Sequence, residues 1–239
     1  PMGYTLRTGQ AKSDWSKVYE SLSKPLVVKP THGTQGKKVF MNIISEETYV
    51  SAVEKCFEHP TGEGSGVIVE EQFAGQEYRI IATREEALAV MCRIPANVVG
   101  DGVHSIEELI TIKNADPRRS DHEAGLLDKI IPDNIVFAHL AEQDLTLNSV
   151  PAAQKQVFLR SNSNISTGGD SIDMTDDAHA SIKELAVQAV RAIPGLAYAG
   201  IDLLTNTISE QQTENSYRII ELNKSPGFSI HEFPFSGKR

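Results

Sequence analysis

Two hydrophobic segments joined by a very short polar connection constrain the fold of this chain more than any other feature. EYRIIAT and ALAVMCRI both have the composition of strands, and only residues 84–86 separate them. A connection of this length joins antiparallel neighbours, because a parallel pair needs a long crossover. GVIVEEQF precedes them as a third expected strand, so we expect an antiparallel meander. Together with the expected helices, the meander predicts an α+β fold and not a doubly wound parallel sheet.

Four helices are expected from serine caps or from hydrophobic residues at helical spacing. They begin near Ser13, Ser45, Ser105 and Ile182. Ser105 is followed at the third position by Glu108, which is the sequence of a reciprocal capping box. Residues 116–155 show no clear pattern of helix or strand.

Composition and charge exclude several classes of protein. The 239 residues are enough for one large domain or two small ones. The formal net charge of -9 argues against general binding of nucleic acid, which needs a basic face. No apolar run approaches the roughly 20 residues of a membrane helix. Cys56 and Cys92 lie in apolar stretches and are expected to be buried thiols, so we expect a soluble cytoplasmic protein. Because the chain opens with Pro1, either an initiator was removed or the sequence starts inside a longer polypeptide.

A run of small polar residues, LRSNSNISTGGDSIDMTD, follows the short expected strand QVFL. Most clusters of Ser, Asn and Gly are surface loops. The alternative is an anion site, in which backbone N–H groups and Arg160 close on a negatively charged ligand. Both interpretations stay open at this point.

Lys29 and a glycine-containing segment follow one another near the amino terminus. Lys29 lies near the end of the apolar strand PLVVKP, where an ammonium group either pairs with an anion or reaches water beyond the strand. Gly33 and Gly36 then allow backbone N–H groups to face phosphate oxygens. The signal is weak alone, because the Gly-Lys-Ser/Thr sequence of a phosphate-binding loop is absent.

Acidic and amide side chains occur in the last two expected strands, AYAGIDLL and YRIIEL. Glu221 and Asn223 alternate along the chain and therefore share a face of their strand. If the two strands pair, Asp202 converges with them, and oxygen ligands of this kind suit Mg²⁺ bound together with phosphates. The alternative is that Asp202 caps a turn and Glu221 faces water.

Basic residues interrupt strands in this acidic protein. Arg79 and Arg93 stand where aliphatic residues are expected, and an arginine on the solvent face of a sheet is ordinary. Together with Lys29 and Arg160, however, they carry enough positive charge to hold a polyphosphate. No catalytic nucleophile stands out, so these groups favour phosphoryl transfer by positioning and neutralisation.

Six segments resemble, in order, the pattern of ATP-grasp ligases. They are PLVVKPTHGTQGKKV, VIVEEQFAGQEYRI, CRIPANVVGDGVHSIEELI, LTLNSVPAAQKQVFLRSNSNISTGGDSIDMTD, AGIDLL and IIELNKSPGFSIHEFPF. From about Pro25 onward the chain is similar to the ATP-grasp portion of cyanophycin synthetase and of the bifunctional enzyme that joins glutamate-cysteine ligase to glutathione synthetase. The resemblance implies an ATP-grasp fold, with two α+β lobes of antiparallel sheets, about 25–95 and 96–239, holding ATP between them. It also implies a Mg-ATP-dependent carboxylate-amine ligase that forms a peptide-type amide bond through an acyl phosphate.

The resemblance assigns roles to matching positions. The residues implied at the nucleotide are Lys29 for the phosphates, Gly33, Thr34, Gln35, Gly36 and Lys37 in the loop over them, Glu70, Glu71 and Phe73 at adenine, and Glu77 at ribose. The implied catalytic residues, which border the transferred phosphate and the acyl intermediate, are Arg93, Arg160, Asn162 and Asn164. The implied metal ligands are Asp202, Glu221 and Asn223, with ATP and two Mg²⁺ ions expected and Mn²⁺ as an alternative. Backbone N–H groups of residues 166–169 are implied near the acceptor amine.

The chain departs from the family pattern at its amino terminus. Relatives usually carry an amino-terminal lobe that binds the acyl substrate, whereas here about 25 residues precede the strand PLVVKP. An alternative is therefore an ATP-binding regulatory module or a catalytic fragment of a longer chain, and a kinase is a third hypothesis. The implied substrates are small amino-acid or peptide carboxylates and amines. Neither nucleic acid nor membrane is expected as a partner, and a homo-oligomer or further domains of a longer chain stay open.

Overall fold

The computed structural model describes residues 3–32, 38–58, 66–120 and 127–238. The chain divides into two compact units, Pro1–Ala74 and Gly75–Arg239, which are described separately below. This boundary lies well before the lobe boundary expected near residue 95, because the strands between residues 76 and 94 pair inside the second unit. Within the described ranges, no helix combines the length and the apolar character needed to cross a membrane.

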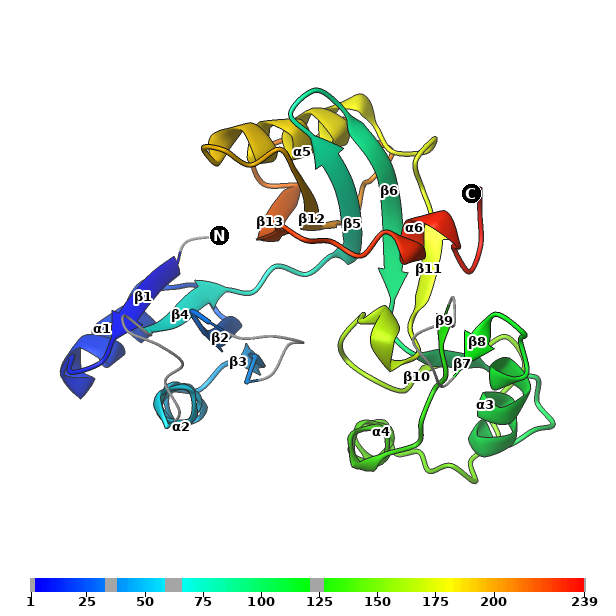
Figure 1. Cartoon of the computed structure of the whole chain (residues 1–239). Coiled ribbons are helices and arrows are strands. Elements are labelled where there is room, and N and C mark those ends of the chain that lie inside the picture. The colour runs from blue at the N-terminus through cyan, green and yellow to red at the C-terminus, as the bar shows by residue number, and fades with distance from the viewer. Residues whose placement is uncertain (1–2, 33–37, 59–65, 121–126, 239) are drawn as a thin grey trace. The chain divides into compact units, whose positions relative to one another are not determined.

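The first unit is a four-stranded antiparallel sheet with two helices (Figure 1). The strands are β1 (Gly3–Arg7), β2 (Leu26–Pro30), β3 (Phe40–Ile43) and β4 (Gly66–Glu71), in the order β1-β4-β2-β3. The helices are α1 (Lys12–Ser21) and α2 (Glu46–Phe57). Leu26 and Val28 of β2 pack with Tyr49 and Val53 of α2 in one core. Because side chains alternate along a strand, Lys29 lies on the opposite face of the sheet.

The segment GVIVEEQF does not join the expected meander. It forms β4, which pairs with β1 and β2 of the first unit. The expectation of three sequential antiparallel strands is therefore wrong for this segment. The strand GYTLR, which the sequence patterns did not indicate, supplies the partner on its other side.

The second unit is built on a five-stranded antiparallel sheet. Its strands are β5 (Gln76–Thr83), β6 (Ala87–Ile94), β11 (Asp170–Asp173), β12 (Tyr198–Thr205) and β13 (Tyr217–Asn223), in the order β11-β6-β5-β12-β13. Helix α5 (Ala180–Ala192) covers one face of this sheet (Figure 1). Its apolar residues Ile182, Ala186 and Val190 are buried against the strands. The expected pairing of AYAGIDLL with YRIIEL is confirmed, and the two strands run antiparallel.

A second core in this unit lies among residues 96–159. Its elements are β7 (Asn97–Val99), α3 (Ile106–Asn114), β8 (Arg119–Ser120), β9 (Leu127–Asp128), α4 (Asn134–Ala141) and β10 (Gln156–Phe158). Strands β7 and β10 pair antiparallel, and α3 and α4 contribute buried apolar residues to the same core. The short 3₁₀ helix η1 (Ile165–Thr167) then leads into β11.

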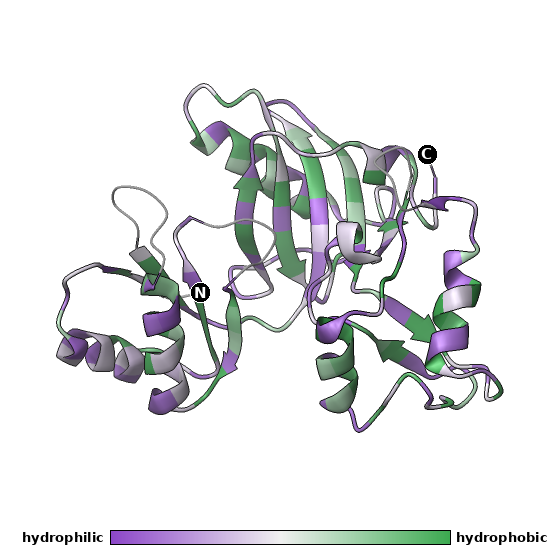
Figure 2. Cartoon of the chain, turned by 60° about the horizontal axis from the view of Figure 1, so that its bottom comes forward, coloured by the Kyte–Doolittle hydropathy of each residue, from purple (hydrophilic) through white to green (hydrophobic). Residues whose placement is uncertain are grey.

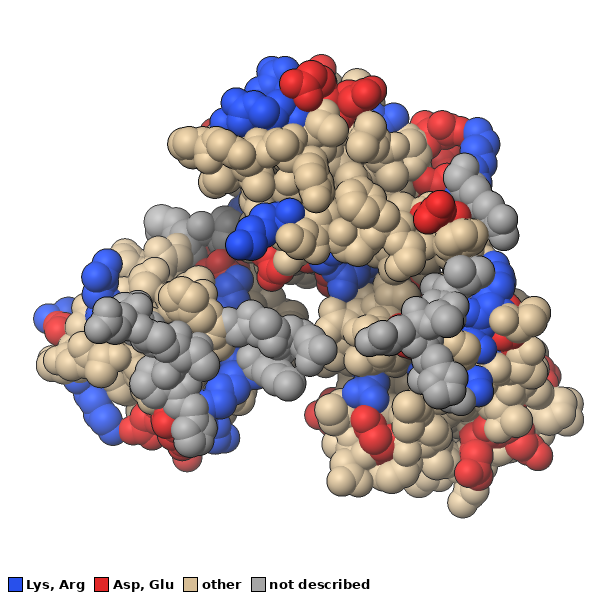
Figure 3. Space-filling model, viewed as in Figure 1, with Lys and Arg blue, Asp and Glu red and all other residues tan. Residues whose placement is uncertain are grey.

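The carboxyl-terminal segment runs across the five-stranded sheet on the side away from α5 (Figure 1). It contains the short helix α6 (Ser229–Glu232) and continues beside β11, where Asp173 N donates to Ser236 O at 2.9 Å. In Figure 2, hydrophilic bands interrupt the otherwise hydrophobic strands of this sheet. Figure 3 shows acidic and basic side chains next to one another at the end of this unit where α5 and the turn between β5 and β6 lie.

Candidate active site

Charged side chains on four neighbouring strands of the second unit lie on one face of the sheet. In the cross-strand register, Glu77 is opposite Arg93, Arg79 is opposite Asp202, and Asp202 is opposite Glu221. The residues between them in β5 and β12 pack against α5, so alternation directs the charged set to the other face. The sheet thus brings together groups that are far apart in the sequence.

Asp202 is at the centre of this charged face and is only 7% exposed. Arg79 binds it with two nitrogens, Nε toward Oδ1 and Nη2 at 2.7 Å from Oδ2. Asn223 Nδ2 lies 3.4 Å from the same Oδ2. Burial lowers the pKa of Arg79, but its hydrogen bond to Asp202 and the charges of Asp202, Glu77 and Glu221 more than offset this, so the pKa is raised. Arg79 is therefore held as a cation facing Asp202.

Arg93 links this centre to the polar run after β10. Its Nη1 lies 2.9 Å from Glu77 Oε1 and 3.3 Å from Asp202 Oδ1. Its Nη2 donates to Asn164 Oδ1 at 2.8 Å, and its Nε donates to Ser163 O at 3.2 Å. With 6% of its surface exposed, Arg93 is fixed by these partners in one orientation. The polar run is consequently part of the wall of the charged face and not a loop remote from it.

Asp202, Glu221 and Asn223 carry the oxygen donors of a hard-metal site. Asp202 and Glu221 are cross-strand neighbours and Asn223 contacts Asp202, so carboxylate and amide groups are gathered at one point. Such oxygen donors fit a hard cation such as Mg²⁺. In the described part of the chain, no group of three His, Cys, Asp or Glu side chains forms a metal centre by itself. A metal bound here would therefore take further oxygens from a ligand.

The residues expected beside the transferred phosphate do not all meet. Arg160 is buried, but its Nη2 donates to Asp133 Oδ2 at 2.6 Å, at the cap of α4. Asn162 Oδ1 accepts from Asn164 N at 3.3 Å and thereby shapes the turn. Arg93 thus reaches Asp202 and Asn164 contacts Arg93, whereas Arg160 is paired with Asp133.

Two glycines in the polar run have a packing role. A Cβ on Gly168, whose φ is +92°, would lie 2.6 Å from Ile130 Cγ1, and one on Gly169 would lie 2.8 Å from Ile94 O. The N–H groups of Thr167 and Gly168 donate to Asn164 O and Ile165 O. The expectation that backbone N–H groups here face a ligand is wrong for these two, because the 3₁₀ turn uses them internally.

The nucleotide residues expected in the first unit lie at or near the end of β4 and on β2. Lys29 forms an ion pair with Glu70 on the sheet face opposite α2. Glu71 accepts from Ser23 N at 2.9 Å, and Phe73 lies in the segment after β4. The expected loop residues Gly33, Thr34, Gln35, Gly36 and Lys37 lie outside the described residues.

His231 of α6 was not identified by sequence reasoning. Its two ring nitrogens are shielded from solvent, and neither has a hydrogen-bond partner within the part of the chain described. Burial, together with the positive charges of Arg79 and Arg93, lowers the pKa of His231 to about 4, although Asp173 opposes this. A neutral imidazole therefore lies beside the charged face. A single histidine in the carboxyl-terminal segment, with no regular pattern around it, gives no local signal of this placement.

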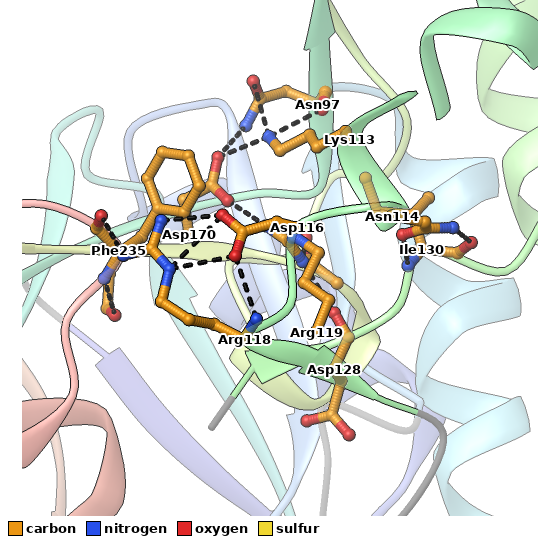
Figure 4. Close-up of polar contacts among 12 residues, drawn as sticks. Asn97, Lys113, Asn114, Asp116, Arg118, Arg119, Asp128, Ile130, Asp170 and Phe235 are labelled. Carbon is orange, nitrogen blue, oxygen red and sulfur yellow. Dashed lines mark hydrogen bonds and ion pairs between the residues drawn. The ribbon is translucent and has the colours of Figure 1, made fainter. Parts of the chain in front are cut away.

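A polar network around Asp170 lies next to Arg118, which holds the carboxyl-terminal segment (Figure 4). Asp170 accepts from Arg119, from Lys113 Nζ at 2.5 Å and from Asn97 Nδ2 at 3.0 Å. Arg118 Nη1 donates to Phe235 O at 2.9 Å. Sequence reasoning missed this network, and the only available signal was the pair of arginines in a region without pattern.

Comparison with known proteins gives a consistent result. No family model matches the chain. The chain is 42% identical over 221 residues to the glutathione biosynthesis bifunctional protein of Pasteurella multocida, which covers 90% of this chain and 28% of that protein. The protein of the same name from Clostridium perfringens is 40% identical over 215 residues, covering 89% and 27%. The chain therefore spans less than a third of the length of these relatives.

Similar solved structures include a protein of the same kind as the relatives found by sequence. The crystal structure of a bifunctional glutathione synthetase from Pasteurella multocida matches with a TM-score of 0.71 at 38% identity, covering 99% of this chain and 32% of that one. The D-alanine–D-alanine ligase of Bacillus anthracis shares the fold alone, with a TM-score of 0.52 and 15% identity, covering 97% and 53%. The expected α+β class is confirmed. The chain has the ATP-grasp fold and is a homologue of one segment of the bifunctional glutathione biosynthesis proteins.

Proposed function

We propose that this chain is an ATP-dependent carboxylate-amine ligase that forms a peptide-type amide bond in a glutathione synthetase-like reaction. The observation that carries the proposal is the row of Arg79, Arg93, Asp202 and Glu221 on one sheet face of a chain 42% identical to a glutathione biosynthesis protein. Two arginines beside two carboxylates and an asparagine suit a metal-bound polyphosphate. The resemblance to cyanophycin synthetase stays a prediction.

The reaction has two steps. A substrate carboxylate oxygen attacks the γ-phosphorus of ATP, and the bond to the β–γ bridging oxygen breaks to leave ADP. The amine then attacks the acyl carbon, and phosphate leaves with the electron pair of the C–O bond while the nitrogen loses a proton. Little covalent chemistry falls to the protein, which acts by positioning and neutralising charge.

The residues of the second unit divide between metal and phosphate. Asp202, Glu221 and Asn223 would hold Mg²⁺, which when bound supplies neutralisation of the phosphate oxygens. Arg93 is oriented by Asn164 and by the carbonyl of Ser163, and its Nη1 pairs with Glu77 and Asp202. An anionic oxygen would bind this guanidinium by replacing one of its carboxylate partners. Arg160 would join it only after exchanging Asp133 for a substrate group.

Residues of the first unit are proposed to bind the nucleotide. Lys29 would exchange its ion pair with Glu70 for a phosphate oxygen. The side chains of Lys29 and Glu70 are only 18% and 24% exposed, so the ammonium group released from Glu70 needs a new anionic partner. Glu70, Glu71 and Phe73 would contact adenine, and Glu77 of the second unit would contact the ribose. The loop of residues 33–37 stays a proposal from the resemblance alone.

A second candidate is an ATP-binding module that needs the rest of a longer protein for turnover. The short coverage of the relatives, 28% of the Pasteurella multocida protein, favours this reading over a kinase. Both candidates predict nucleotide binding. Only the ligase predicts that ADP release depends on an amine.

The test is ADP release measured with pairs of carboxylate and amine substrates, beginning with γ-glutamylcysteine and glycine. We expect ADP only when both substrates are present. Asp202→Asn should lower turnover by at least about 100-fold, because a metal ligand in a charge-neutralising site is lost. Asp144→Asn, the same change at an exposed position, should leave turnover unchanged.

Each other outcome assigns a different function. ADP release without an amine indicates a kinase or an ATPase. Nucleotide binding with no ADP release for any pair indicates the binding module. Full activity of Asp202→Asn removes this carboxylate from the metal site.

A further inference from the structure

The carboxylate proposed to bind metal is already occupied by a side chain. Asp202 accepts from Arg79 on both oxygens, from Arg93 on Oδ1 at 3.3 Å, and from Asn223 on Oδ2 at 3.4 Å. A guanidinium and a divalent cation compete for the same oxygens. Metal can therefore bind Asp202 only if Arg79 gives up this two-point contact.

The backbone is built to hold Arg79 in this position. Residue 200 precedes Asp202 by two positions on β12 and so lies on the same face of the strand. It is Gly200, and a Cβ added there would lie 3.1 Å from Arg79 Cδ and 2.8 Å from Pro226 Cβ. The absence of a side chain thus leaves the space through which the arm of Arg79 reaches Asp202. On the other side of this space lies Pro226 of the carboxyl-terminal segment.

Charge balance shows what must accompany the exchange. The face carries Arg79 and Arg93 against Glu77, Asp202 and Glu221. A divalent cation added alone would meet two guanidinium groups in a partly buried setting and would leave Arg79 without its partner, which is costly. A triphosphate added with the metal supplies acceptor oxygens for the released guanidinium.

We propose that Arg79 is an exchangeable counter-ion, which pairs with Asp202 in the free protein and binds the triphosphate when metal takes Asp202. The consequence is that divalent metal binds tightly only together with nucleotide. Arg79 is then a phosphate-binding residue of the same site, in addition to Arg93. This inference rests on the proposed function, because it uses the metal and nucleotide assignments made there.

The experiment measures Mn²⁺ binding by electron paramagnetic resonance, with and without a non-hydrolysable ATP analogue. For the unaltered protein we expect Mn²⁺ to bind at least 10-fold more tightly when the analogue is present. Arg79→Gln should bind Mn²⁺ alone at least 10-fold more tightly than the unaltered protein, because the competing cation is gone. The same variant should bind the analogue at least 10-fold more weakly.

Two further variants separate this effect from general disruption. Arg84→Gln is the matched control, since Arg84 lies in the turn between β5 and β6 and donates to Leu196 O instead of to the charged face. It should leave both affinities unchanged. Arg79→Lys keeps the positive charge beside Asp202 but loses the two-nitrogen contact, so it should give intermediate metal affinity even if Arg79→Gln does not fold.

The outcomes distinguish the inference from the proposed function. If the analogue binds but neither Arg79→Gln nor Arg79→Lys gains affinity for Mn²⁺ alone, the counter-ion role is wrong and the nucleotide site stands. Tight Mn²⁺ binding to the unaltered protein without nucleotide also overturns it. If the analogue does not bind even with Mn²⁺ present, the proposed function fails together with the inference.

Discussion

Protonation of His231 should destabilise the folded protein. Its pKa is lowered to about 4 from an ordinary value of 6.5, because it is shielded from water and lies near Arg79 and Arg93. Between these two pH values the unfolded chain binds a proton that the folded protein does not. The free energy of unfolding therefore falls as the pH is lowered from 6.5 through 4, by about 3 kcal/mol in total.

The measurement is urea unfolding at a series of pH values for the unaltered protein and for His231→Gln. Between pH 6.5 and 4, the free energy of unfolding of His231→Gln should fall by about 3 kcal/mol less than that of the unaltered protein. His104→Gln provides a contrast, because the hydrogen bond that the His104 ring donates to the Asp101 carboxylate raises the pKa of His104, and its protonation favours the folded state. That variant should lose more stability at low pH than the unaltered protein. If the free energy of unfolding falls with pH in the same way for His231→Gln and the unaltered protein, His231 is not the group responsible.

Helix caps were predictable from the sequence because the interactions are local. Ser45 caps α2, and Ser105 with Glu108 forms the expected capping box at α3. Ser13, by contrast, lies inside α1, which begins at Lys12 after Ala11 without a side-chain cap. The pairing of β4 with β1 and β2 could not be predicted from neighbouring residues, because these strands lie far from β4 in the sequence. The same limit applies to residues 116–155, which hold α4 and two short strands.

The capping box should contribute measurably to stability. Ser105→Ala removes the acceptor for Glu108 N and should lower the free energy of unfolding by about 1 kcal/mol. Thr111→Ala, at an exposed position inside the same helix, should instead raise it by up to about 0.5 kcal/mol, because alanine is the better helix former. Chemical denaturation of both variants checks the opposite signs. Equal effects of the two substitutions would show that the box is not the source of the stability.

The convergence of the proposed metal ligands could be predicted from the sequence, whereas the rest of the candidate site depended on the fold of the whole chain. Alternation placed Glu221 and Asn223 together, and strand pairing brought Asp202 to them as expected. The contact of Arg79 with Asp202 requires the register of β5 against β12 and the empty position at Gly200. No residue pattern shows these features before the sheet order is known.

The two units have separate cores, and this should appear as separate local stability. Val53 of α2 and Val190 of α5 are both fully buried, each in the core of its own unit. Replacing either by alanine should cost about 2 kcal/mol, through lost burial and the cavity left behind. The two cores share no residue, and the free energy of local unfolding depends on local packing. The loss of stability in one unit should therefore leave local unfolding of the other unit unchanged.

Hydrogen exchange followed by mass spectrometry tests this with the two matched variants. Val53→Ala should speed exchange of amides in α2, β2 and β4 and leave those of α5 and β12 unchanged, and Val190→Ala should do the reverse. The comparison is internal, since each variant is the other's control for the same chemical change. Equal acceleration in both units by either variant would mean that they unfold as one cooperative block, and the division at Ala74 would then have no energetic meaning.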